Sequence, residues 1–99
     1  MIFSDYTIHG YMTAKAELDE LEAKITLMKA KADKATAETR IRYERQVEEL
    51  RRKYDQSKKR LNEFIESSQV GWEEIQSGVD KAMQDLRTSV NSAANQILE

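Results

Sequence analysis

The apolar residues of this 99-residue chain recur every three or four positions over most of its length. Steps that alternate between three and four place side chains on one face of an α-helix and form the heptad seam of a coiled coil. The pattern falls into three runs. The positions of this predicted seam are Leu18, Leu21, Ile25 and Met28, then Tyr43, Val47, Leu50, Tyr54, Leu61 and Phe64, then Trp72, Ile75, Val79, Leu86 and Val90.

Two junctions separate the runs, at 35–43 and 64–72, where two steps of four follow each other. Such stutters locally relax a left-handed supercoil. The second junction contains two serines and Gly71, so we predict a helix break there. The first contains no Gly, Pro or Asn, and nothing in it forces a helix to stop. In the third run we take Ala82 as a seam position. The steps from Ala82 to Leu86 and from Leu86 to Val90 are then both four, which predicts a third stutter.

We therefore predict an all-α, coiled-coil domain over 13–99, with one long helix over 13–66 and a shorter helix over 72–98. The segments 13–39, 40–66 and 72–98 contain 27 residues each, and equal lengths suit a three-helix bundle. A monomer would bend at the first junction. A homodimer would keep the junction straight and pair the long helices antiparallel, as a domain-swapped bundle. The absence of turn residues favours the dimer.

The composition agrees with long helices that each bury a narrow stripe. Charged residues make up 34% of the chain and hydrophobic residues 39%, which is too little apolar material for a thick core. Proline is absent and glycine occurs three times, so the chain cannot make the many tight turns of a β-sandwich. The absence of cysteine excludes disulfides and thiolate metal ligands.

The first twelve residues differ from the rest. Residues 1–12 are rich in aromatic and β-branched side chains and nearly uncharged, and we expect an irregular arm. They lack the positive and apolar regions of a secretory signal. No stretch approaches the roughly 18 apolar residues that span a bilayer. We expect a cytoplasmic protein without a transmembrane segment.

The charge is distributed unevenly along the chain. The net formal charge is −2 over 1–39, +5 over 40–60 and −5 over 61–99. Opposite charges favour packing of the basic middle segment against the acidic C-terminal helix. That helix is amphipathic, but anionic lipid would repel its acidic face, so we do not expect it to bind a membrane surface.

The basic segment contains a candidate anion-binding face, which consists of Arg51, Arg52, Lys53, Lys58 and Lys59. Cations on a helix can follow a phosphate backbone. Acidic residues are interleaved at positions 44, 48, 49 and 55, however. We therefore favour a solvated, self-complementary face and keep nucleic-acid binding as the alternative.

The sequence predicts no catalytic residues, no metal site and no cofactor. His9 is the single histidine, and it lies in the expected arm, where nothing rigid would orient it for acid–base work. Adjacent carboxylates such as Glu48 and Glu49 point away from each other on a helix. Trp72 is expected to anchor one end of the bundle. Gly71 and Gly78 lie on one helix face, where they either let a neighbouring helix approach closely or are simply tolerated at a cost of about 1 kcal/mol each.

Two segments carry a resemblance, 42–51 (RYERQVEELR) and 68–82 (SQVGWEEIQSGVDKA). The chain resembles small bacterial coiled-coil domain-containing proteins of uncharacterised function, from about Ala16 to about Leu86. The resemblance implies a non-enzymatic, stress-associated protein, and no functional residues transfer with it.

These observations favour a helical interaction protein that associates with itself, as a homodimer, and with another helical protein. The first alternative is binding of nucleic acid or another anionic polymer through the basic segment 40–60. The second is a chaperone-like or surface-coating protein that exposes its apolar seam.

Overall fold

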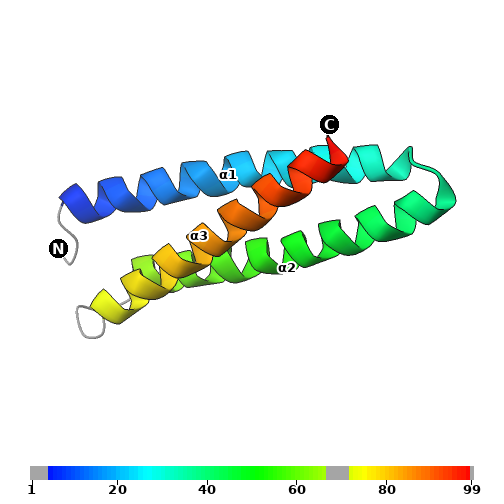
Figure 1. Cartoon of the computed structure of the whole chain (residues 1–99). Helices are drawn as coiled ribbons and strands as arrows, with labels where there is room; N and C mark the ends of the chain where they lie inside the picture. The colour runs from blue at the N-terminus through cyan, green and yellow to red at the C-terminus, as the bar shows by residue number, and fades with distance from the viewer. Residues whose placement is uncertain (1–4, 67–71, 99) are drawn as a thin grey trace.

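The computed structural model is a bundle of three helices, α1 (Asp5–Asp33), α2 (Ala37–Glu66) and α3 (Trp72–Ile97), that run alternately up and down (Figure 1). It describes residues 5–66 and 72–98, without the side chains of 5–8, 72 and 73. The bundle measures 53 × 19 × 17 Å. The predicted all-α class is confirmed, and the described residues contain no strand.

The N-terminal helix starts earlier than the sequence suggested. The expected irregular arm over 1–12 is wrong from Asp5 onward, because α1 begins there. Tyr11 and Ala14 extend the seam upstream of Leu18 in steps of three and four, and both pack half-buried against the core. Burial of these residues outweighs the low helix propensity of the aromatic and β-branched residues around them.

The first junction is a turn, so the predicted continuous helix over 13–66 is wrong. Helix α1 ends at Asp33 and α2 begins at Ala37. The amides of Lys34 and Ala35 donate to carbonyls three residues back, at 3.2 and 3.1 Å, which tightens the last turn of α1. The chain then reverses direction, and α2 returns alongside α1 (Figure 1).

Thr36 explains how the chain turns without glycine or proline. It directly precedes α2, and its carbonyl accepts the first helical hydrogen bond, from the Arg40 amide at 2.7 Å. Its hydroxyl bonds that of Thr39 at 3.2 Å. Threonine is a favoured N-cap residue, and Glu38 adds a negative charge to the positive end of the helix dipole. Thr36 therefore occupies the N-cap position of α2, with its hydroxyl bonded to the Thr39 side chain.

The core follows the seam closely. Most predicted seam positions are buried, and Tyr43 and Ile75 are half-buried against the core. The side chain of Trp72 and the predicted helix break at 67–71 lie outside the described residues. The buried predicted positions are Leu18, Leu21, Ile25, Met28, Val47, Leu50, Tyr54, Leu61, Phe64, Val79, Leu86 and Val90.

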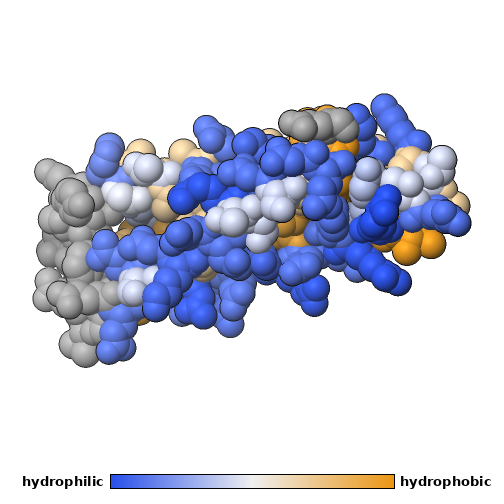
Figure 2. All heavy atoms as spheres, in the orientation of Figure 1, coloured by the Kyte–Doolittle hydropathy of each residue, from blue (hydrophilic) through white to orange (hydrophobic). Residues whose placement is uncertain are grey.

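In α3 the seam passes through Met83 and not Ala82. Met83 is buried and Ala82 only half-buried. The steps from Val79 through Met83, Leu86 and Val90 then alternate four and three, so the expected stutter at Ala82 is wrong. The reason is that the larger apolar side chain gains more from leaving water. On the face of the bundle that Figure 2 shows, hydrophilic residues dominate the surface and apolar atoms appear between the helices.

Helices α2 and α3 approach closely around Ser57, the one buried polar residue of the described core. Its hydroxyl lies 2.9 Å from the Lys53 carbonyl and 3.3 Å from the Ala82 carbonyl on α3. Nearby, a Cβ atom on Gly78 would lie 3.1 Å from Nη1 of Arg60. The Arg60 side chain is exposed and can move aside, so the close approach of this helix pair rests on Ser57.

Candidate functional site

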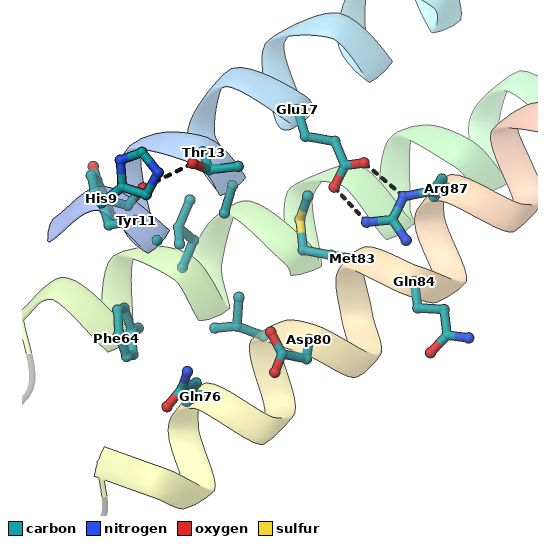
Figure 3. A pocket seen from close by; sticks show the side chains of 14 residues that line it. His9, Tyr11, Thr13, Glu17, Phe64, Gln76, Asp80, Met83, Gln84 and Arg87 are labelled. Atoms are coloured by element: carbon teal, nitrogen blue, oxygen red, sulfur yellow. Dashed lines mark hydrogen bonds and ion pairs between the residues drawn. The ribbon is translucent and has the colours of Figure 1, made fainter. Parts of the chain in front are cut away.

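A pocket of about 620 Å³ opens where α1 begins, α2 ends and α3 begins (Figure 3). Helix α3 runs diagonally across the bundle, and at this end it lies nearer α2 than α1 (Figure 1). We call this cavity the end pocket. Its apolar floor consists of Ala14, Leu61, Phe64, Val79 and Met83. A concave apolar surface with a few polar groups is the usual form of a binding site.

An ion pair closes one side of the end pocket. Arg87 on α3 donates from Nε and Nη2 to the two carboxylate oxygens of Glu17 on α1, each at 2.6 Å (Figure 3). These hydrogen bonds hold the pKa of Glu17 below its ordinary value, against the opposing effect of burial. The two-pronged geometry ties α1 to α3 at a defined separation.

The rest of the rim is polar and carries one net negative charge. Gln76, Asp80 and Gln84 come from α3, while His9 and Thr13 come from α1. The Thr13 hydroxyl donates to the His9 carbonyl at 2.9 Å. Glu17 and Arg87 neutralise each other, and Asp80 is exposed and has no ion pair within 5–66 and 72–98. The rim therefore favours a ligand that carries a cation.

The lining is better suited to binding than to acid–base chemistry. Glu17 is committed to Arg87, and His9 is exposed. Within the part of the chain that the structure describes, no group of three or more His, Asp or Glu side chains is arranged to hold a metal ion.

Replacing Glu17 with glutamine should lower stability by about 0.5–1 kcal/mol at pH 7, a modest loss because both partners are partly exposed. The folded-state pKa of Glu17 lies below its ordinary 4.5. The ion pair therefore contributes fully to the free energy of unfolding above pH 4.5. This stabilisation is lost as the pH falls through the folded-state pKa of Glu17. Urea unfolding of both proteins between pH 7 and about pH 3 should show the difference shrinking in acid. A pH-independent difference would contradict it.

The predicted anion-binding face does not form one surface. Arg51 turns toward α1, where Nη2 donates to the Thr26 hydroxyl at 3.3 Å. Lys53 turns toward α3, with Nζ 3.3 Å from Asp85 and 2.8 Å from the Ser89 hydroxyl. The remaining members, Arg52, Lys58 and Lys59, are exposed. The five cations thus point in different directions around α2.

The solvent-facing side of α2 is mixed in charge. Steps of three and four place six exposed charged residues on this side: Arg45, Glu48, Arg52, Asp55, Lys59 and Glu63. Positive and negative charges alternate along it. Beside it, a shallow hollow between α1 and α2 is lined by Lys29, Arg51 and Arg52, but Glu48 lies among them. A phosphate backbone would meet carboxylates at each turn.

The expected pairing of the basic and acidic helices is present in part. Lys53 on α2 pairs with Asp85 on α3. Arg87, a cation of the acidic helix, instead pairs with α1. Near the C-terminal end of α3, Gln96 joins α2 through uncharged groups: its side-chain oxygen accepts from Gln46 at 2.6 Å and its carbonyl accepts from the Tyr43 hydroxyl at 3.3 Å.

The end pocket is not predictable from the spacing of residues in the sequence. Glu17 and Arg87 are 70 positions apart, and no spacing rule relates residues on separate helices. The one available signal was that Arg87 is one of only two cations in the acidic C-terminal segment. No described helix is long and apolar enough to cross a membrane. Comparisons with protein-family models, curated proteins and solved structures find no match for this chain.

Proposed function

We propose that this chain is a non-enzymatic interaction protein that binds an amphipathic helix of a partner protein in the end pocket. The observation that carries this proposal is the apolar floor between α1 and α3, at the end where these helices are apart. The lining spans His9–Glu17 on α1 and Gln76–Arg87 on α3, or about 12–17 Å of helix. That length fits anchors at positions i, i+3 or i+4, and i+7 of one bound helix.

The charge of the rim points to a basic partner helix. Asp80 lacks an ion pair within the described residues and lies beside the apolar floor. A lysine or arginine next to the apolar anchors would pair with it. Phe64 and Met83 are only 6% and 4% exposed, so binding covers little further apolar surface. We expect roughly micromolar affinity.

A designed peptide tests the proposal. The probe is a helical peptide of about 18 residues, with leucines at i, i+3, i+4 and i+7 and lysines beside them, and its binding is followed by fluorescence anisotropy. Asp80→Lys should weaken binding about tenfold, and Ala14→Trp should abolish it by filling the pocket. Asp55→Lys, which makes the same charge change on the outer side of α2, is the matched control.

Two results would overturn this function. One is binding that survives Ala14→Trp in a variant whose circular dichroism shows an intact fold. The other is equal loss in Asp80→Lys and Asp55→Lys, which would mean that net charge alone attracts the peptide. A probe with glutamates in place of lysines should bind weakly, because Asp80 would then face like charge.

The alternatives have less support. The alternating charges on α2 and the dispersal of the five predicted cations argue against nucleic-acid binding. A chaperone-like role would use the apolar seam, which is buried within the bundle.

A further inference from the structure

Helix α1 carries apolar residues on its outer side as well as in the seam. Five exposed apolar positions form what we call the outer stripe: Met12, Ala16, Ala23, Leu27 and Ala30. They are separated by steps of four, seven, four and three, and exposed Asp19 lies on the same face within the step of seven. Met12 is 63% exposed and Leu27 58% exposed, and within the described residues only Ile41 is a comparable large exposed hydrophobic. Apolar atoms also appear along the edge of the molecule where α1 runs (Figure 2).

The sizes along the outer stripe are self-complementary. Its large residues are Met12 and Leu27, and the remaining positions are alanine. Consider an antiparallel pair in which Leu27 of one copy lies opposite Ala16 of the other. Met12 of one copy then lies beside Ala30 of the other, because residues 12 and 30 are centred on nearly the same point of the helix as residues 16 and 27. Each large side chain then meets a small one. A parallel pair would set Leu27 against Leu27 and leave gaps between the alanines.

The charges beside the stripe agree with the same register. Glu20 and Lys24 are exposed, lie one turn apart on one side of the stripe, and form no ion pair with any described residue. In the antiparallel register Glu20 lies within one residue of directly opposite Lys24 of the second copy. Two-fold symmetry repeats this pair. In a parallel pair this side of the stripe would lie on opposite sides of the contact in the two copies, so Glu20 would not face Lys24 of the second copy.

We propose that the outer stripe of α1 is a self-association surface on which a second copy of this chain docks antiparallel. The contact is isologous and closes at two copies. It uses a different surface from the end pocket, and so does not depend on the proposed function. The stripe is about 27 Å long and rich in alanine, which implies a smaller buried area than the 1,200–2,000 Å² or so of stable complexes. The dimer should therefore dissociate on dilution.

Sedimentation equilibrium from about 10 μM to about 1 mM tests the dimer in the full-length chain. The wild-type protein should pass from monomer to dimer in this range. Leu27→Glu should remain monomeric, because it buries an unpaired charge in the contact. Ile41→Glu is the matched control, since Ile41 is 56% exposed on α2. A wild-type protein that is monomeric throughout, or equal loss in both variants, would refute the proposal.

A charge-exchange experiment tests the orientation. Glu20→Lys and Lys24→Glu should each self-associate at least about tenfold more weakly than wild type, because each places like charges together across the contact. An equimolar mixture of the two variants restores opposite charges on both sides and should form a 1:1 dimer. Failure of the mixture to associate, while the wild-type protein does, would overturn the antiparallel register.

Discussion

Replacing Leu86 with alanine is expected to lower the free energy of unfolding by about 3–5 kcal/mol. Leu86 is 0% exposed and lies in the middle of α3. Truncation removes buried methyl groups and leaves a cavity that three long helices cannot easily collapse. A domain of this size has only about 5–15 kcal/mol of stability, so the variant loses a large share of it.

Urea unfolding followed by circular dichroism measures this loss. Leu27→Ala is the matched control, because it removes the same atoms from a side chain that is 58% exposed. It should change the stability of the monomer by less than about 0.5 kcal/mol, at a concentration where the chain does not associate. Similar losses in the two variants would contradict the burial pattern of the bundle.

Deleting residues 34–36 is expected to convert the bundle into a domain-swapped dimer. The deletion removes Thr36, the N-cap residue of α2, and joins Asp33 directly to Ala37. Ala32 and Thr39 would then be four positions apart, so one helix can carry the seam across the junction. With α1 and α2 continuous, α2 cannot fold back on its own α1 and packs on the second copy instead. This restores the arrangement that the sequence first suggested.

Small-angle scattering with light scattering distinguishes the two forms. The 29 and 30 residues of α1 and α2 make a helix of about 90 Å, compared with 53 Å for the present bundle. The experiment uses a Leu27→Glu background, which removes association through the outer stripe. Replacing residues 34–36 with three glycines should keep the short form. A deletion variant that stays monomeric and short would disprove the expectation.

The error at the first junction has an identifiable cause. Glycine, proline and asparagine are the usual signals for a turn, and residues 33–39 contain none of them. A threonine followed by an acidic residue is also a helix start. Thr36 and Glu38 carried that signal, but the unbroken apolar spacing permitted either a turn or a helix.

The charged side chains also lie differently from the prediction. The five cations of the predicted anion-binding face are close in sequence, yet Arg51 faces α1 and Lys53 faces α3. Helical spacing alone places them on different sides of α2, but which sides are covered depends on where the neighbouring helices pack. The end pocket likewise depends on the diagonal path of α3.

The sequence by itself determined the helical class and most of the core, because the spacing of apolar residues dictates which face of each helix must leave water. It also contained the residues of the outer stripe, but only the bundle shows that they stay exposed. The tertiary structure decided the turn at 34–36, the choice of Met83 over Ala82, the Glu17–Arg87 pair and the end pocket. These features depend on distances between separate helices, which local periodicity does not encode.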